Sequence, residues 1–316
     1  MVVERWRHVA SFFAVAHIDR VCGVQCAYSQ PMTAASEGLG ARPARVAGIS
    51  GRGRRVALWL ARPAYALYTR RLRRHVRAAD APRHLAVILD GNRRWALGEG
   101  LHEAGAGHRR GADKIDELLD WCAPLGIEEI TVWALSNENL GRPGTQLTAL
   151  FDVVCDKLLA LEERALAPET AMRMRVIGRL EELPERVCAT IRRIEQSTAG
   201  QPGPSLTIAL GYSGRDELID ACKALVLALA DDGVPAARIA EEITRESLAA
   251  RLYTAGAPDP DLIIRTSGEQ RLSGFLPWQS AHSELYFTDV YWPAFRELDL
   301  LRALRTYQQR VRRHGL

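Results

Sequence analysis

An uninterrupted run of five apolar residues, Leu85–Leu89, constrains the fold of this chain more than any other feature. A run this short, with two β-branched members and polar flanks, is typical of a strand buried on both faces of a parallel sheet. Four similar runs follow, with helical patterns between them, at residues 129–135, 172–177, 206–210 and 262–265. The alternation predicts a single α/β domain with a central, mainly parallel sheet flanked by helices.

The spacing of apolar residues also predicts the helices and leaves one long loop. We expect helices at about residues 64–76, 108–124, 145–167 and 298–313. The stretch from Gly91 to Gly107 is rich in glycine and polar residues, so we expect a loop there. Right-handed crossovers would bring the carboxyl ends of the strands to one edge of the sheet, where α/β folds bind ligands. The loop would then cover that edge.

The residues that follow the first strand, Asp90-Gly91-Asn92-Arg93-Arg94, are the first candidates for a ligand site. Gly91 allows a tight turn and a close approach of the backbone to a ligand. Donors and positive charges crowd around one carboxylate, which suits a phosphorylated substrate and a divalent cation. A capped strand end with surface arginines is the alternative, and these five residues alone favour neither.

Two further stretches place this motif in a wider pattern. Ser-Asn-Glu-Asn at 136–139 follows the second predicted strand, and Arg-Thr-Ser-Gly-Glu-Gln-Arg-Leu-Ser-Gly occupies 265–274. Together with Asp-Gly-Asn-x-Arg-Trp at 90–95, they resemble the cis-prenyltransferases, the family of undecaprenyl diphosphate synthase, over about residues 64–316. The resemblance implies an enzyme that joins isopentenyl diphosphate to an allylic diphosphate, geranyl or farnesyl, and forms a cis double bond. It also implies an apolar tunnel for the prenyl chain.

The resemblance assigns the chemistry to particular positions. Asp90 matches the aspartate that handles magnesium bound to diphosphate, and Glu284 matches a second carboxylate ligand of that metal. Mg²⁺ fits this task because it prefers oxygen ligands and bridges phosphate oxygens. Asn139 and Ser136 match positions beside the reacting carbons. Asparagine is a poor base, so we expect Asn139, the second predicted catalytic residue after Asp90, to orient the substrate or relay a proton to diphosphate.

Most of the remaining matches are diphosphate-binding positions. Arg265, Arg271 and Ser273 match a clamp for isopentenyl diphosphate, in which the planar fork of arginine binds phosphate oxygens bidentately. Instead of binding diphosphate, the strand-end arginines could form structural ion pairs. His108 could likewise be a surface residue or a helix-capping residue. The full set of predicted substrate-binding residues is Gly91, Asn92, Arg93, Arg94, Trp95, His108, Ser136, Asn137, Glu138, Arg142, Arg265, Arg271, Leu272 and Ser273.

Two features point to different product lengths. The long loop between Trp95 and His108 and the segment at 267–274 resemble the actinobacterial short-chain branch, which makes (2Z,6E)-farnesyl diphosphate from geranyl diphosphate. Ala134 instead resembles long-chain decaprenyl or undecaprenyl synthases, which supply a cell-wall lipid carrier, because a small side chain leaves the tunnel open. We expect the short-chain product and keep the long-chain product as the alternative. Candidate lining residues of the tunnel are Trp95, Trp133, Leu135, Leu140, Phe151 and Val154.

Charge is distributed unevenly along the chain. Between Glu37 and Asp80 there are eleven arginines and no acidic residue, so a net charge of +4 leaves 4 − 11 = −7 for the rest. We expect residues 1–63 to form a poorly ordered basic leader before a cis-prenyltransferase domain at 64–316. The basic arm could also touch anionic lipid as a peripheral membrane contact, or nucleic acid, although we expect no nucleic-acid partner. No apolar run approaches the roughly 20 residues of a membrane span, which indicates a cytoplasmic protein.

The end of the chain and the cysteines bear on assembly and metals. Arg313-His-Gly resembles a family tail that reaches the diphosphate across a dimer interface, so we expect a homodimer. The alternative is a C-terminal helix whose basic residues interact favourably with the helix dipole.

The six cysteines are scattered, and Cys22 and Cys26 lack a second ligand pair, so we expect no structural zinc.

Two other functional classes fit less well. A non-catalytic partner subunit of a prenyltransferase usually lacks the strand-end aspartate and the arginine clamp that this chain keeps. A nucleotide-binding Rossmann enzyme would carry Gly-x-Gly-x-x-Gly after the first strand, where this chain has Asp90-Gly91-Asn92.

Overall fold

The computed structural model describes residues 65–310 except 104, 142 and 143. Contacts group the chain into two units, Met1–Arg71 and Leu72–Leu316, and the sheet lies wholly in the second. Residues 65–75 are helical, as predicted for 64–76. The expected leader at 1–63 and the candidate residues Arg142 and Arg313 lie outside the described residues.

Six parallel strands form one sheet in the order β3-β4-β2-β1-β5-β6. All five residues of β1 are buried, because neighbouring strands and both covering layers shield it, so the prediction of a doubly buried strand is confirmed. The last strand was not predicted, since its residues are half-buried and occupy an edge. The strands are β1 His84–Ile88, β2 Glu129–Trp133, β3 Arg173–Ile177, β4 Ser205–Ala209, β5 Leu262–Arg265 and β6 Glu284–Phe287.

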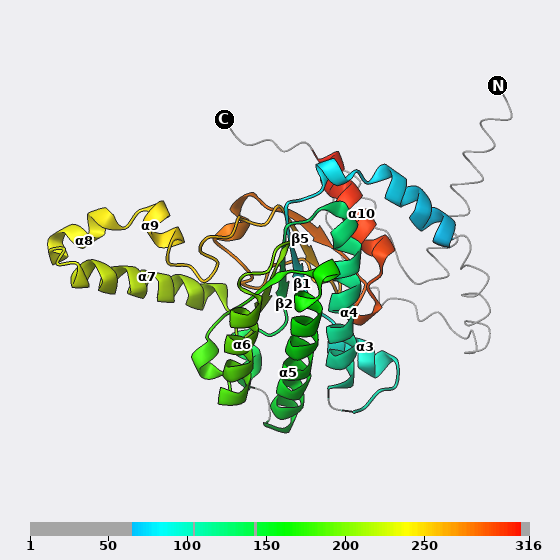
Figure 1. The fold of residues 1–316 in the computed structure, drawn as a ribbon, viewed down its shortest axis with the longest axis horizontal. Coiled ribbons are helices and arrows are strands. Elements are labelled where there is room, and N and C mark those ends of the chain that lie inside the picture. The colour runs from blue at the N-terminus through cyan, green and yellow to red at the C-terminus, as the bar shows by residue number, and fades with distance from the viewer. Residues whose placement is uncertain (1–64, 104, 142–143, 311–316) are drawn as a thin grey trace, which may run out of the picture. The chain divides into compact units, whose positions relative to one another are not determined.

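Helices connect the strands (Figure 1), and α4, α5 and α6 lie in front of the sheet in that view. Helix α7 extends away from the sheet, with α8 and α9 folded back along it. No helix in the described part of the chain is both long and apolar enough to cross a membrane. The helices are α3 Asn92–Gly98, α4 Ala106–Cys122, α5 Gly144–Leu166, α6 Glu185–Thr198, α7 Gly214–Asp231, α8 Ala236–Glu242, α9 Arg245–Ala249 and α10 Glu297–Gln309.

Helix α3 corrects the prediction of a continuous loop between Gly91 and Gly107. Its amphipathic signal is weak because it is only seven residues long and only Ala96 is buried. The helix is stabilised instead by its packing against α4. In α4, a Cβ atom on Gly107 would lie 2.2 Å from the Asn92 carbonyl oxygen, so the glycine lets the two helices touch.

The strand order creates a crevice beside β1. After β1 the chain builds β2, β3 and β4 on one side, then crosses to place β5 on the other side of β1. At such a switch point the connections after neighbouring strands run in opposite directions, and ligands bind in the gap between them. The gap here lies at the carboxyl ends of β1 and β5, which Asp90 and Arg265 mark.

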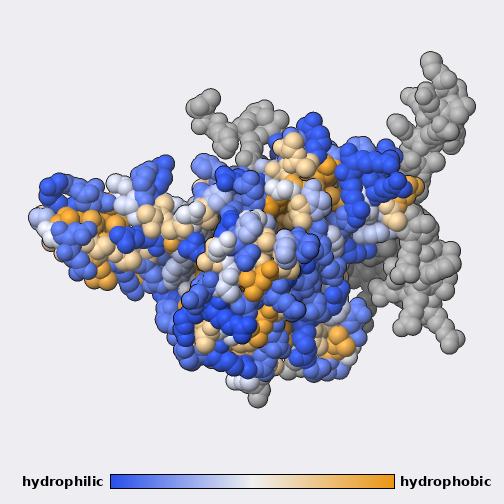
Figure 2. All heavy atoms as spheres, in the orientation of Figure 1, coloured by the Kyte–Doolittle hydropathy of each residue, from blue (hydrophilic) through white to orange (hydrophobic). Residues whose placement is uncertain are grey.

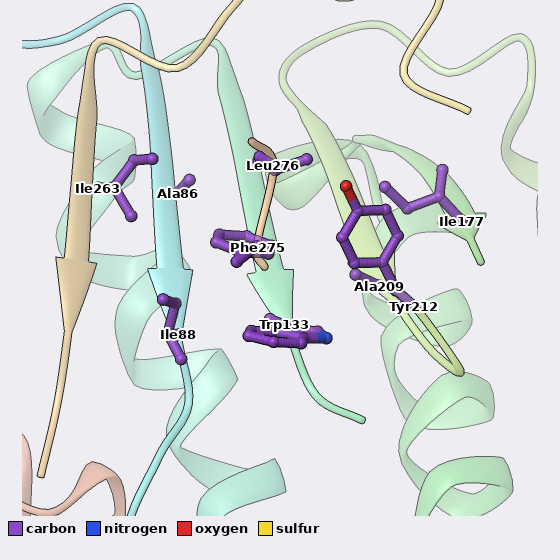
Figure 3. Packing of buried hydrophobic residues seen from close by; sticks show 9 residues of the cluster. All are labelled: Ala86, Ile88, Trp133, Ile177, Ala209, Tyr212, Ile263, Phe275 and Leu276. Carbon is purple, nitrogen blue, oxygen red and sulfur yellow. The ribbon is translucent and has the colours of Figure 1, made fainter. Parts of the chain in front are cut away.

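Side chains at the end of β1 pack on both faces of the sheet, because successive side chains of a strand point to opposite sides. Ile88 joins the buried cluster shown in Figure 3, where the rings of Trp133 and Phe275 stack with centroids 5.2 Å apart. Leu89 faces the opposite side, towards α4 and α5. The carboxyl edge of the sheet therefore adjoins two different apolar layers.

Candidate functional site

Asp90 lies at the centre of a charged cluster. Its Oδ2 accepts a hydrogen bond from Arg265 at 3.0 Å, and its Oδ1 accepts one from Arg94 at 3.3 Å. Burial would raise the pKa of Asp90, but hydrogen bonds from Arg265 and Ser267 and the charges of Arg265 and Arg94 hold it below its usual value. The residue is therefore an ionised carboxylate surrounded by cations at neutral pH.

Two hydroxyl residues that the sequence analysis missed support Asp90. The Thr266 side chain is fully buried; its Oγ1 donates to the Asp90 carbonyl oxygen at 2.7 Å and accepts from the Asp90 N–H at 3.0 Å. Ser267 accepts from Arg94 at 2.8 Å and has a φ of 82°, a region that non-glycine residues rarely occupy. Such strain is concentrated at functional sites. Their position directly after Arg265 was the only signal in the sequence.

Gly91 forms the turn that the motif predicted. It has a φ of 100°, and a Cβ atom there would lie 2.6 Å from Tyr291 Cδ1, so both conformation and space require glycine. The turn starts α3 and projects Arg94 back over the strand end. The Arg94 guanidinium lies 5.4 Å from the centre of the Tyr291 ring, which holds it beside Asp90.

The Asn92 carboxamide offers an acceptor to the site. Its Nδ2 donates to the Leu89 carbonyl oxygen at 2.9 Å. Its Oδ1 is buried and has no hydrogen-bond partner among the described residues. Helix α4 approaches so closely that a Cβ atom on Gly111 would lie 2.2 Å from this oxygen. A buried acceptor without a partner is unusual, and a donor from a ligand would satisfy it.

Ser136 precedes a short 3-10 helix at Asn137–Gly141, and the four predicted residues at 136–139 make different contacts. Asn139 donates from Nδ2 to Ser136 Oγ at 2.9 Å, and both line the pocket. Asn137 instead donates to Asp216 in the first turn of α7 at 3.0 Å, so it anchors the turn from behind. Glu138 is exposed and lines no part of the pocket.

The predicted arginine clamp is partly assembled. Arg265 is 6% exposed and donates from Nη1 to Ser273 Oγ at 2.7 Å and to the Arg271 carbonyl oxygen. The Arg271 side chain is exposed and pairs with Glu269 at 2.5 Å. Leu272 packs against the core cluster. Of the two arginines of the predicted clamp, Arg265 is held by its hydrogen bonds in the pocket lining and Arg271 is paired with Glu269 outside it.

These groups surround a pocket of about 470 Å³. The predicted residues that line it are Asp90, Gly91, Asn92, Arg93, Arg94, His108, Ser136, Asn139, Arg265 and Ser273. The structure adds Ile88, Leu89, Leu97, Trp133, Ala134 and Leu135, of which Trp133 and Leu135 were candidate tunnel residues. Predicted site residues that lie among the described residues but not in this lining are Trp95, Asn137, Glu138, Arg271, Leu272 and Glu284.

A narrower apolar cavity of about 60 Å³ continues from the pocket. The two share Leu89, Asn92, His108 and Ala134, so they adjoin at the end of the sheet. The cavity runs between the sheet and helices α4 and α5, and Val154 is the candidate tunnel residue that lines it. Its further lining residues are Gly111, Ala112, Ile115, Leu150, Val153, Lys157, Leu158, Ile208, Leu210 and Trp292.

The predicted pairing of Asp90 with Glu284 on one metal ion is not formed within one chain. Glu284 begins β6 in register with Leu262, which pairs with Leu85 of β1. Asp90 is five residues further along, about 16 Å at 3.3 Å per residue. Glu284 instead accepts from Arg310.

Asp90 alone still suits a magnesium ion. In the described part of the chain, no three His, Cys, Asp or Glu side chains converge on a possible metal position. Mg²⁺ needs few protein ligands when diphosphate and water complete its octahedron. An ionised carboxylate at the edge of a pocket with space for a diphosphate meets that requirement.

Comparison with known proteins identifies the family. Residues 88–315 match the prenyltransferase family model, described as undecaprenyl diphosphate synthase. The chain is 48% identical to "Isoprenyl transferase 1" of Corynebacterium diphtheriae over 80% of its length and 94% of the relative's. It is 49% identical to "(2Z,6E)-farnesyl diphosphate synthase" of Thermobifida fusca, over 80% and 97% respectively.

A solved structure has the same fold. The lavandulyl diphosphate synthase of Lavandula x intermedia, in complex with dimethylallyl diphosphate, superposes with a TM-score of 0.70. It is 32% identical and the match covers 75% of this chain and all of that one. The chain belongs to the cis-prenyltransferases, the family of undecaprenyl diphosphate synthase, and is a prenyltransferase.

Proposed function

We propose that the protein condenses isopentenyl diphosphate with an allylic diphosphate, geranyl diphosphate in preference to farnesyl, to form (2Z,6E)-farnesyl diphosphate. The observation that carries the proposal is the junction of a charged pocket with an apolar cavity through Leu89, Asn92, His108 and Ala134. A prenyl diphosphate has the same two parts. Its diphosphate would bind among the arginines and its hydrocarbon chain would enter the cavity, as a prenyl tunnel requires.

The allylic diphosphate would bind beside Asp90. Arg94 and Arg93 supply positive charge at the start of α3, and both line the pocket. A bound Mg²⁺ held by Asp90 would neutralise charge on the departing diphosphate. Asn92 and His108 line both this pocket and the apolar cavity, so they would flank the point where the diphosphate joins the hydrocarbon chain. Glu284 would reach such an ion only if a second chain supplied it.

Isopentenyl diphosphate would bind on the other side of Asp90. Arg265 presents a guanidinium that Asp90 and Ser273 already orient, so little side-chain entropy is lost on binding. Arg271 would leave Glu269 to complete the clamp. Asn139 and Ser136, which face the same pocket, would orient the new bond or pass the released proton to diphosphate.

The short-chain product is favoured over the long-chain alternative. Relatives at 49%, 47% and 46% identity carry the names (2Z,6E)-farnesyl diphosphate synthase or short-chain Z-isoprenyl diphosphate synthase. Ala134 supports the alternative, because it leaves the junction of pocket and cavity open.

We also propose that the enzyme is a homodimer. Ile219, Cys222 and Val226 recur at helical spacing on α7, and Leu227 is 65% exposed. Figure 2 shows apolar residues over the α7–α9 arm among charged ones. A second copy would cover them. The test is mass in solution, with a bifunctional maleimide joining two Cys222 thiols and Cys222→Ser as the control.

The basic region before the sheet is proposed to touch anionic lipid. Arg70, Arg71, Arg73 and Arg74 are exposed on the helix at 65–75, and Arg73 pairs with Glu297. Co-sedimentation with vesicles of phosphatidylglycerol, compared with phosphatidylcholine, tests this contact. Binding that is equal for both lipids, or unaffected by salt, would refute it.

A product assay tests the activity. Purified protein, Mg²⁺ and labelled isopentenyl diphosphate are combined with dimethylallyl, geranyl or farnesyl diphosphate in separate reactions. We expect one cis addition to geranyl diphosphate, and no product from Asp90→Ala because its metal ligand is lost. A ladder of long products would favour the long-chain synthase. No product from any primer would favour the non-catalytic partner subunit.

A further inference from the structure

A lysine interrupts the apolar wall of the cavity between α4 and α5. Lys157 on α5 lines the cavity, and its side chain is only 11% exposed. Its ammonium group donates to the Asp116 carboxylate on α4, in an ion pair that joins the two helices. Apart from His108, all other lining residues of α4 and α5 are apolar or glycine. A charge at this position is therefore unexpected for simple packing.

The ion pair lies at the end of the cavity away from Asp90. His108 lines both the charged pocket and the cavity, whereas Ile115, seven residues later on α4, lines only the cavity. Seven residues of α-helix span about 10 Å. Asp116 directly follows Ile115, so its pairing with Lys157 joins the two helices beside the part of the cavity that is furthest from His108 along α4; the Asp116 side chain is 39% exposed, so the carboxylate lies towards solvent.

We propose that the Lys157–Asp116 ion pair is the stop that limits the length of the prenyl chain. The inference rests on the proposed function and adds to it the group that sets product length. Lysine packs its methylene stem along apolar surface and keeps its charged head at the edge. A chain that outgrows the cavity must separate the ammonium from its carboxylate and surround the charge with hydrocarbon, which is strongly unfavourable. Ala134 then opens the entrance without lengthening the cavity.

Three substitutions at Lys157 distinguish the effect of its side-chain size from the effect of its charge. Lys157→Ala removes the stem and the charge, Lys157→Met keeps an unbranched stem without the charge, and Lys157→Arg keeps both. The matched control is Arg164→Ala. Arg164 pairs with Asp120 at 2.6 Å, again joins α5 to α4, and lines neither cavity nor pocket. Thermal unfolding of each variant shows whether it remains folded.

Two readouts are needed so that product length and chain binding are judged separately. The first is the length distribution of products from geranyl diphosphate and isopentenyl diphosphate. The second is the affinity for unreactive alkyl diphosphates of five to twenty carbons, measured by calorimetry, which requires no turnover. In the wild-type protein affinity should rise with chain length and then stop rising where the chain reaches Lys157.

We expect Lys157→Ala to raise the ratio of longer products to fifteen-carbon product about tenfold or more, since extra methylenes then find an apolar site. Lys157→Met should give part of this increase, and Lys157→Arg and Arg164→Ala none. An unchanged distribution in active Lys157→Ala, an equal increase in Arg164→Ala, or a ladder of long products from the wild type overturns the inference.

The binding series keeps the two proposals distinguishable. If the wild type makes no prenyl product, the proposed function fails, but the calorimetry still decides the role of Lys157. If the chain length at which affinity stops rising is greater only in Lys157→Ala and Lys157→Met, the proposed role of the ion pair is supported. If this chain length is the same in all variants, the role is refuted.

Discussion

Replacing Gly111 by alanine should lower the catalytic rate strongly at a smaller cost in stability. Gly111 faces Asn92 from α4, and a Cβ atom there would lie 2.2 Å from Asn92 Oδ1 and 3.0 Å from Trp292 Cδ1. Ordinary contacts of a Cβ atom begin at 3.4 Å, so the Asn92 oxygen must move by about 1.2 Å. The carboxamide end is the most easily displaced group, because the backbone of α3 is fixed by the turn at Gly91.

Opposing effects keep the cost in stability small. Alanine is more favourable than glycine inside a helix by up to about 1 kcal/mol. Overpacking a buried position costs about 1–3 kcal/mol. The free energy of unfolding should therefore fall by about 2 kcal/mol at most. Displacement of a substrate-positioning group by about 1 Å can lower the rate about 100-fold, or about 2.7 kcal/mol of transition-state stabilisation.

Steady-state kinetics with both diphosphates and urea unfolding give the two quantities. Gly98→Ala is the control, because a Cβ atom there meets nothing within 4 Å and the change should leave kcat/KM unaffected. In a double-mutant cycle, Gly111→Ala should cost little once Asn92→Ala has removed the oxygen it displaces. Wild-type kcat/KM in Gly111→Ala, or additive losses in the cycle, would refute the reasoning.

Three further results are expected. Arg265→Lys should lower kcat/KM for isopentenyl diphosphate about 100-fold, because an ammonium cannot contact Asp90, Ser273 and a phosphate at once, and an unchanged kcat/KM would contradict this. Because the folded pKa of Asp90 is lowered, its stabilising effect is present above the unfolded value of about 3.9 and is lost as pH falls through the folded pKa. The difference in Tm between wild type and Asp90→Asn should therefore be steady from neutral pH to about 4 and shrink below it. Asn137→Ala should lower kcat about tenfold by releasing the turn, whereas the same variant in an Asp216→Ala background should add little if the two act together.

Much of the architecture follows from short-range patterns. An unbroken apolar strand is most stable where both of its faces are covered, so the run Leu85–Leu89 favoured a strand inside a parallel sheet. The structure places β1 at His84–Ile88 and β5 at Leu262–Arg265, within one residue of expectation. The polar residues that interrupt these patterns mark the strand ends, and hence the edge that carries the pocket.

Other features depend on contacts between distant segments. Helix α3 has too few buried residues to show a period, and it forms because Gly107 and Gly111 let α4 pack against it. The Thr266 hydroxyl has no local partner; it becomes part of the site because β5 lies beside β1 and brings it to the Asp90 backbone. No pattern within either segment contains that information.

Residue type and hydrophobic period are enough to predict which groups occupy the strand ends, since they fix where a buried strand stops and polar residues begin. Which of these groups meet depends on the order and register of the strands. Strand order placed Arg265 beside Asp90, although 174 residues separate them, because β5 pairs with β1. Register placed Glu284 about 16 Å back along the strand direction, because it begins a strand instead of ending one and parallel strands keep their two ends at opposite edges.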